Sequence, residues 1–362
     1  MNTRVESVDV LRGVTIVAMI LVNTPGSWSA VYPSLLHAQW HGYTPTDLIF
    51  PFFLFIVGTS ISFAYKNKKA SPVIYRKITI RSFKLVCLGL ILAAFLPYFP
   101  FVTDLNLIRI PGVLQRIGIV FFFTAILSLH YNWKVLLGIT LVLLIGYWIW
   151  LGFIPLPDGS LPTYERATNN WASYIDVTLL KNHTWKPDYD PEGVLSTIPS
   201  IASALIGVLI GKVILHQHYM KTGLLLLLGA GLIGLGYLWN VWFPFNKAIW
   251  SSSFVLVTAG WATLILGLLY YINDVKKIKI GRVFKQVGSN AIVIYFASSF
   301  ISKTFYLIHI GDTTVHGWIY KKFFTSFISV DKLASLAYAI SVVLFYIFIG
   351  YVMYKKRIFI KV

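Results

Sequence analysis

The sequence predicts an all-α, polytopic integral membrane protein with about ten transmembrane helices and both termini in the cytoplasm. Of its 362 residues, 57% are hydrophobic and only 12% are charged, whereas a soluble chain carries about 25% charged residues. The apolar residues form runs of about 20, the length that an α-helix needs to cross a bilayer. Lys and Arg gather in alternate connections between these runs, which predicts their orientation. These observations exclude an ordinary soluble enzyme.

Ten apolar stretches can be drawn along the chain. They cover residues 10–30, 46–65, 78–97, 110–130, 133–153, 194–215, 222–242, 249–272, 288–308 and 333–354. The longest connection, 154–193, holds 40 residues, which leaves no room for a separate soluble domain. We therefore expect a single transmembrane domain over residues 1–362, with this connection as an outer loop between spans five and six.

The net charge of +18 would point to nucleic acid in a soluble protein. Here 21 of the 31 Lys and Arg fall in connections on one side of the predicted spans, nine fall on the other side, and Arg116 lies within a span. The positive-inside rule assigns the richer side to the cytoplasm. The expected partner is therefore the lipid bilayer and not nucleic acid, and a homo-oligomer is compatible with the sequence.

Four polar residues at the outer ends of the first two spans are candidates for chemistry, because such groups are costly in a membrane. They are Asn23, His37, His41 and Asp47. His37 oriented by Asp47 could act as a general base. His37, His41 and Asp47 could instead bind a metal, but no further His or Cys completes a familiar ligand pattern, and we expect no metal. A histidine satisfied by a backbone carbonyl is the structural alternative.

Two arginines lie along the start of the fourth span. Arg116 is seven residues after Arg109, or about 10 Å deeper along a helix. A buried guanidinium needs an anion, which Asp47 or a ligand phosphate or carbonyl could supply.

The outer loop 154–193 is acidic and aromatic, a mixture that can grip a sugar or an amine, or can simply be a solvated loop with interfacial aromatic residues. Gly229, Gly231 and Gly234 match a dinucleotide-binding pattern. Because they lie inside an apolar stretch, we expect them to serve close helix packing instead, as do Gly207 and Gly211.

Seven segments in collinear order resemble one known family. The segments are Ser7-Val-Asp-Val-Leu-Arg-Gly13, Leu21-Val-Asn23, His37 to Asp47 with Phe50-Pro51-Phe52, Arg109-Ile-Pro-Gly-Val-Leu-Gln-Arg116, Asp190 to Thr197, Asn246 to Ser253, and Gly288-Ser-Asn-Ala291. They closely resemble the heparan-α-glucosaminide N-acetyltransferase family and its bacterial relatives. The resemblance covers about residues 9–300.

This resemblance implies a membrane enzyme that takes acetyl from cytosolic acetyl-CoA and delivers it to the amine of a glucosamine-type sugar at the outer face. It implies His37 as the functional histidine, with Asn23 and Asp47 beside it. His37 would deprotonate the amine and Asn23 would donate to the developing oxyanion. Direct transfer and a transient acetyl on His37 both stay open, and we favour direct transfer.

The remaining candidates follow from topology. For the phosphates or carbonyls of acetyl-CoA they are Arg12, Arg81, Lys84, Arg116 and Arg282, and for the acceptor they are Asp47, Arg109, Glu192, Asn246 and Trp250. We expect a small amino sugar or a cell-wall fragment as acceptor and a bacterial inner membrane as location. An amino-sugar transporter or flippase, and a membrane O-acyltransferase of cell-envelope sugars, are the rival functions.

Overall fold

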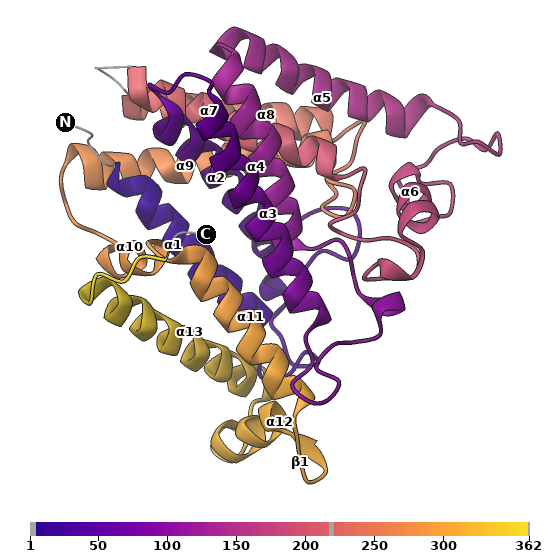
Figure 1. The fold of residues 1–362 in the computed structure, drawn as a ribbon, viewed down its shortest axis with the longest axis vertical. Coiled ribbons are helices and arrows are strands. Elements are labelled where there is room, and N and C mark those ends of the chain that lie inside the picture. The colour runs from indigo at the N-terminus through magenta and orange to yellow at the C-terminus, as the bar shows by residue number, and fades with distance from the viewer. Residues whose placement is uncertain (1–4, 217–220, 361–362) are drawn as a thin grey trace.

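The ten apolar stretches form ten long helices in the computed structural model, which describes residues 5–216 and 221–360 (Figure 1). These helices are α1 (Glu6–Asn23), α2 (Ile49–Tyr65), α3 (Pro72–Ala94), α4 (Val113–His130), α5 (Trp133–Phe153), α7 (Thr197–His216), α8 (Lys221–Trp239), α9 (Ser252–Tyr270), α11 (Ala291–Leu307) and α13 (Asp331–Lys355). The predicted all-α class is confirmed.

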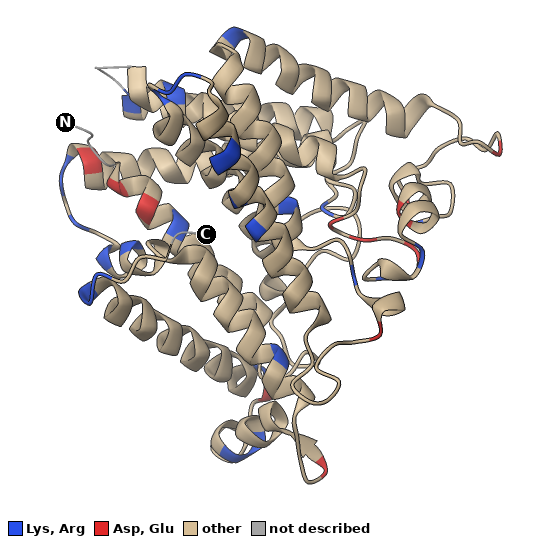
Figure 2. Cartoon of the chain, in the orientation of Figure 1, with Lys and Arg blue, Asp and Glu red and all other residues tan. Residues whose placement is uncertain are grey.

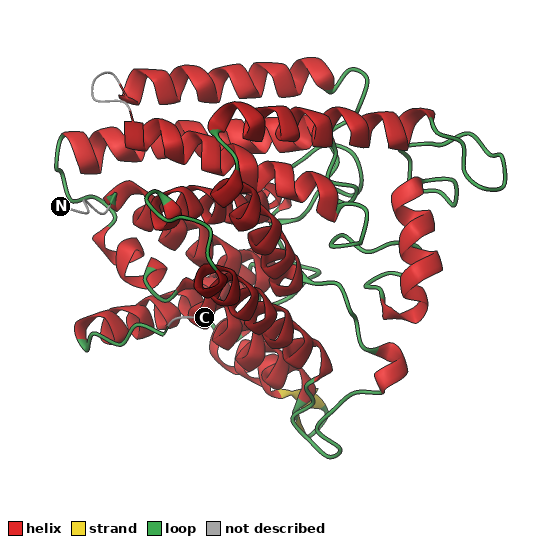
Figure 3. Ribbon diagram, turned by 45° about the horizontal axis from the view of Figure 1, so that its top comes forward, coloured by secondary structure: helices red, strands yellow, loops and turns green. Residues whose placement is uncertain are grey.

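Short elements connect the long helices. They are α6 (Trp171–Leu180), α10 (Arg282–Gly288), α12 (Val315–Tyr320), the 3₁₀ turns η1 (Pro33–Leu35), η2 (Pro45–Leu48), η3 (Leu105–Leu107) and η4 (Lys181–His183), the π-helical turns η5 (Tyr271–Val275) and η6 (Lys321–Thr325), and the antiparallel strands β1 (His309–Ile310) and β2 (Thr313–Thr314). Figure 3 shows long loop connections gathered around α6 at one edge of the helices.

In the part of the chain that the structure describes, seven helical segments are long and apolar enough to cross a membrane. They are Pro45–Tyr65, Val113–His130, Trp133–Phe153, Thr197–His216, Lys221–Trp239, Ser252–Val275 and Asp331–Lys355. The other three expected spans differ for a physical reason: α1 and α3 carry several charged residues, and α11 has 17 residues. The count of ten spans and the orientation of the termini therefore stay predictions. Figure 2 shows Lys and Arg mainly near helix ends and in connections.

The helices pack around α1 and α2. Helix α1 contacts α2, α9, α10, α11 and α13, and α2 also contacts α4, α7 and α9. Buried apolar side chains from these helices form one large cluster that includes Leu11, Leu54 and Phe254. Several hydroxyl groups inside the spans bond to backbone carbonyls one turn back, as Thr258 does to Phe254, which satisfies them without water.

Small residues allow the closest helix crossings. A Cβ at Gly207 would lie 2.1 Å from the carbonyl oxygen of Phe55, and one at Gly211 would lie 2.0 Å from the Ser62 hydroxyl. The expected close packing at Gly207 and Gly211 is thus confirmed, between α7 and α2.

The glycine pattern in α8 behaves differently. A Cβ at Gly229 would lie 2.7 Å from Leu264 on α9, which confirms close packing at that position. Nothing lies within 4 Å of a Cβ at Gly231 or Gly234. The packing prediction is therefore wrong for these two residues, because their side of α8 faces away from α9.

The crossing of α1 with α10 is the tightest of these contacts. A Cβ at Gly13 would lie 1.8 Å from the carbonyl oxygen of Phe284, and one at Gly288 would lie 2.5 Å from that of Asp9. Both glycines belong to segments that resemble the family. The crossing holds the charged start of α1 against the segment that carries Arg282.

We predict that Gly13→Ala destabilises the protein, because the added methyl group meets backbone that cannot rotate away. Overpacking of this kind costs roughly 1–3 kcal/mol. The matched control is Gly138→Ala in α5, where nothing lies within 4 Å of a Cβ and helix propensity favours alanine by roughly 0.5–1 kcal/mol. Thermal unfolding in detergent should show a lower midpoint for Gly13→Ala alone. Equal midpoints for the two variants would contradict the tight crossing.

Candidate active site

The segment before α2 folds back on the carboxylate of Asp47. Thr44 precedes the η2 turn, and Pro45 begins it. The Oδ2 atom of Asp47 accepts hydrogen bonds from the backbone N–H groups of Ala38 and Thr44, each at 3.0 Å, and from the Thr44 hydroxyl at 3.2 Å. The side chain of Asp47 is only 1% exposed. Its charge is therefore held by donors from its own loop.

The second oxygen of Asp47 faces two basic groups. Oδ1 lies 2.7 Å from Nδ1 of His37 and 3.3 Å from Nζ of Lys247. The His37 side chain is 52% exposed, so its ring can be reached from outside while Asp47 stays buried. Because Nδ1 faces Asp47, Nε2 is the nitrogen available to a substrate. The structure thus brings together the predicted pair, His37 and Asp47.

His41 does not join this pair. Its Nε2 atom lies 3.1 Å from Glu165 of the outer loop, and its Nδ1 atom lies 3.5 Å from the Asn246 amide. Within residues 5–216 and 221–360, no three His, Cys, Asp or Glu side chains gather in a way that could hold a metal ion. His37 and His41 therefore point to different partners.

Asn23 is the last residue of α1 and is exposed. Among the described residues, none forms a hydrogen bond with its side chain. Helix α1 contacts the η2 turn that carries Asp47, so Asn23 lies on an element next to the site. Its expected role at the oxyanion stays a prediction.

Lys247 comes from the connection between α8 and α9, and two buried neighbours shape that connection. Asn246 accepts a hydrogen bond from the N–H of Ile249 at 3.0 Å and donates its own N–H to Ser251 at 3.0 Å. Trp250 has a left-handed backbone, with φ of 53°, and its indole donates to Ser203 at 3.0 Å.

Asn246 and Trp250 are fully buried. In this conformation they hold the connection in shape, and their predicted contact with an acceptor stays untested. Burial lowers the pKa of Lys247, and the charges of Asp47 and Glu192 offset only part of that effect.

A second charged cluster lies beside the first. Arg109 donates from Nε and Nη2 to both oxygens of Asp190, at 2.8 and 2.6 Å, and from Nη2 to Glu192. The guanidinium also lies 5.2 Å from the ring of Trp185. Burial acts to lower the pKa of Arg109, but the bonds and charges of Asp190 and Glu192 outweigh it and raise the pKa above its ordinary value. The predicted residues Arg109 and Glu192 are therefore in contact.

Arg116 is 1% exposed and lies next to this cluster. Its Nη2 atom donates to the carbonyl of Gly193 at 3.1 Å and to the Ser196 hydroxyl, and its guanidinium lies 5.1 Å from the ring of Trp250. Among the described residues, its Nε and Nη1 atoms form no hydrogen bond. Its hydrogen bonds go to a carbonyl and a hydroxyl and not to Asp47, which was one expected anion.

Asp176 stabilises the turn formed by residues 190–194. Its carboxylate accepts hydrogen bonds from the N–H groups of Asp190 and Val194, at 3.1 and 2.9 Å. Burial raises the pKa of Asp176 to about 6. Asp176 cannot be distinguished in the sequence from the other acidic residues of the outer loop, because only the fold buries it.

The residues predicted to bind acetyl-CoA do not form one group. Arg12 pairs with Asp9 at 2.9 Å and donates to Ser60 at 2.8 Å. Arg81 lies 4.6 Å from the Phe121 ring and within electrostatic reach of Arg12, while Lys84 is exposed. Arg116 lies next to the second charged cluster, away from the others.

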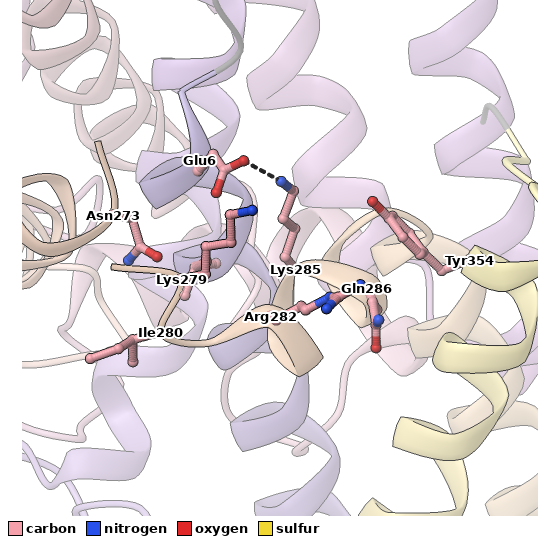
Figure 4. Close-up of a pocket in the computed structure, with 9 residues that line it drawn as sticks. Glu6, Asn273, Lys279, Ile280, Arg282, Lys285, Gln286 and Tyr354 are labelled. Atoms are coloured by element: carbon pink, nitrogen blue, oxygen red, sulfur yellow. Dashed lines mark hydrogen bonds and ion pairs between the residues drawn. The ribbon is translucent and has the colours of Figure 1, made fainter. Parts of the chain in front are cut away.

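Arg282 lines a separate cavity of about 230 Å³ between α1, α10 and α13 (Figure 4). The cavity is also lined by Glu6, Val10, Asn273, Lys279, Ile280, Lys285, Gln286 and Tyr354. Lys285 reaches Glu6 at 2.6 Å. An open groove of about 480 Å³ shares Arg282, Gln286 and Tyr354 and adds Lys355 and Arg357. Arg282 was predicted from the sequence, whereas Lys279 and Lys285 were not.

Lys247 is the other residue that the sequence analysis missed. It lies between Asn246 and Trp250, which were both selected, and it is the only charged residue of the short connection 240–251. In the sequence, the feature that could have identified Lys247 was its position as a single positive charge between two apolar spans. Its contact with His37 joins residues 210 positions apart, which no local pattern predicts.

Comparison with known proteins agrees with the resemblance. Residues 4–230 match a family model described as heparan-alpha-glucosaminide N-acetyltransferase, catalytic. Two curated proteins named heparan-alpha-glucosaminide N-acetyltransferase are similar, the human protein at 31% identity and the mouse protein at 30%, each over 99% of this chain. The chain spans 60% of the length of each of these relatives.

Two bidentate Arg–Asp pairs, Arg109–Asp190 and Arg166–Asp188, provide a matched test of the second charged cluster. Arg109 is 25% exposed and Asp190 is fully buried, whereas Arg166 and Asp188 are 46% and 45% exposed. We predict that Arg109→Met costs roughly 3–5 kcal/mol, because Asp190 keeps a buried charge without its partner. Arg166→Met should cost about 0–1 kcal/mol. Thermal unfolding in detergent measures both, and similar losses would contradict the distinction.

Proposed function

Because the chain belongs to the heparan-α-glucosaminide N-acetyltransferase family, we propose that it is a transmembrane acetyltransferase. The proposed reaction moves acetyl from cytosolic acetyl-CoA to the amine of a glucosamine-type sugar at the outer face. The observation that carries the proposal is the exposed His37 ring bonded to the buried Asp47 carboxylate at 2.7 Å.

The His37–Asp47 pair suits a general base. A glucosamine ammonium must lose a proton before its nitrogen can attack a thioester, and an imidazole can accept that proton near neutral pH. Asp47 fixes the ring through Nδ1 and stabilises the imidazolium that forms. Nε2 is then free to face the amine.

Two routes are consistent with this arrangement. In direct transfer the amine attacks the thioester carbonyl while both substrates are bound, and Asn23 is the donor to the oxyanion that the resemblance implies. In the alternative, His37 first carries the acetyl group. We favour direct transfer, because it needs no second activation step. Intersecting initial-rate plots are expected for direct transfer, and parallel plots would favour acetyl-His37.

The acceptor is proposed to bind beside the second charged cluster. Arg109, Glu192, Asn246 and Trp250 all lie on the connections around His37, and the outer loop contacts the same segment when Trp40 donates to the carbonyl of Tyr164 at 2.9 Å. The carboxylates and aromatic rings of these connections suit a small amino sugar or a cell-wall fragment as acceptor. The proposed location is a bacterial inner membrane, and a homo-oligomer is compatible with it.

The nucleotide end of acetyl-CoA is proposed to bind at the cavity around Arg282. Phosphate groups favour cations, and Lys279, Arg282 and Lys285 line this cavity with Glu6 as the one acid (Figure 4). Arg12, Arg81 and Lys84 lie on α1 and α3 and stay candidates for the path that the pantetheine arm would follow. Arg116 is a candidate for the acyl end, since it lies near the second charged cluster.

We predict that the purified protein releases thiol from acetyl-CoA when glucosamine is present, and that His37→Ala abolishes most of this release. A positioned general base contributes roughly 10²–10⁴-fold, and a loss of that size is expected. His41→Ala is the matched control, because His41 faces Glu165 and not Asp47. It should retain most of the wild-type rate.

The outcome separates the rival functions. Release that depends on an amine acceptor supports the acetyltransferase, and release that needs a hydroxyl acceptor indicates the O-acyltransferase. Folded protein that releases no thiol with any amino sugar would overturn the proposal, and uptake of amino sugar into proteoliposomes without acetyl-CoA would then favour the transporter.

We predict that Arg282→Ala raises the KM for acetyl-CoA with little change in kcat. A hydrogen bond to a charged group contributes roughly 1.5–3 kcal/mol, which corresponds to about a 10- to 100-fold change in affinity. Lys276→Ala is the control, because Lys276 is exposed in the neighbouring connection and does not line the cavity. An unchanged KM in Arg282→Ala would show that the nucleotide binds elsewhere.

A further inference from the structure

Lys247 lies over the ring of the proposed base. Its Nζ atom is 3.0 Å from Nδ1 and 3.4 Å from Nε2 of His37. The Cε1–H group separates these two nitrogens in the plane of the ring, so a group close to both lies above the face. Lys247 therefore leaves the in-plane direction of Nε2 open to an amine. It places a cation within a few ångströms of the atom at which proton transfer would occur.

Several charged groups from different elements face Lys247. Asp47, in the η2 turn, lies 3.3 Å from Nζ, Glu192 approaches from the outer loop, and Arg116 approaches from α4. The Lys247 side chain is 18% exposed. It is thus shielded from bulk water, where a charge would be screened, yet it borders the exposed His37. A charge in such a place acts more strongly on a bound reactant than one at the surface.

The geometry favours Lys247 over Asn23 as the group that meets developing negative charge. Among the described residues, Asp47 and Lys247 are the charged groups that contact His37. Asp47 is negative and would repel an oxyanion. Asn23 is exposed at the end of α1, and its side chain forms no hydrogen bond within the described part of the chain. Within residues 5–216 and 221–360, only Lys247 offers a positive charge and hydrogen-bond donors next to Nε2.

We propose that the ammonium of Lys247 stabilises the oxyanion of the tetrahedral intermediate during acetyl transfer. The inference rests on the proposed function. The amine enters this step neutral, because its ammonium proton has already passed through His37 to solvent. Its nitrogen forms a bond to the thioester carbon, the C=O π pair moves onto oxygen, and Nε2 of His37 takes the second proton from nitrogen. The oxyanion then re-forms the carbonyl, the C–S bond breaks, and the CoA thiolate takes the proton from His37. Lys247 keeps its proton throughout.

The buried ammonium suits this role for a second reason. Burial lowers the pKa of Lys247 below the ordinary lysine value, and a more acidic N–H group donates a stronger hydrogen bond to an oxyanion. The same shift sets a pH limit. As pH rises through this lowered pKa, Lys247 loses its proton and the stabilisation disappears. An arginine at the same position would stay charged.

The test compares steady-state kinetics of the wild type, Lys247→Met and Lys247→Arg with acetyl-CoA and glucosamine. Removing one oxyanion donor costs about 100- to 1,000-fold in kcat, and Lys247→Met should show this loss with an unchanged KM for acetyl-CoA. Lys247→Arg should recover much of the rate and keep it to a higher pH than the wild type. Lys186→Met, at an exposed lysine of the outer loop, should leave kcat unchanged.

The outcomes distinguish this inference from the proposed function. An inactive wild type would overturn the proposed function itself. An active wild type with an equally active, folded Lys247→Met variant would overturn the role of Lys247 alone. If Lys247→Met does not fold, the pH profiles of Lys247→Arg and the wild type decide. Profiles that fall at the same pH, or a low melting temperature with no rescue by arginine, would indicate a purely structural lysine.

Discussion

Asp47 is a nearly fully buried carboxylate on which five donors converge. Four of them belong to the preceding loop, namely two backbone N–H groups, the Thr44 hydroxyl and the His37 ring. The fifth is the Lys247 ammonium. A buried anion is stable only when such donors surround it. The loop that carries His37 and the connection that carries Lys247 are therefore both bonded to the η2 turn that precedes α2.

In the second charged cluster, donors likewise surround a buried carboxylate. Asp190 accepts hydrogen bonds from Nε and Nη2 of Arg109. It also accepts one from the backbone N–H of Trp185 at 2.7 Å. Its own N–H donates to Asp176, which lies beneath the turn. In a chain with 13 acidic residues among 362, these few buried carboxylates shape the irregular outer segments. The spans themselves need only apolar packing and internal backbone bonds.

The difference between the regular spans and the irregular connections explains why some site residues could be predicted from the sequence and others could not. His37 and Asp47 are ten residues apart in one loop, and a histidine followed by a proline-started turn with an acid is visible in the sequence. Lys247 is 210 residues from His37, and its role depends on how two connections meet at one end of the bundle. Asn246 and Trp250 were visible as polar and aromatic residues, but only the fold shows that both are buried.

The sequence by itself determined the all-α class, the positions of the ten long helices and the His37–Asp47 pair. It could do so because apolar run length and local spacing are properties of contiguous residues. The tertiary structure alone decided that Arg109 meets Asp190 and Glu192, that Arg116 bonds to the 193–196 turn, and that Arg282 lines a cavity with Glu6. These contacts join segments brought together by helix packing. Their energies depend on distance and burial, which no one-dimensional pattern specifies.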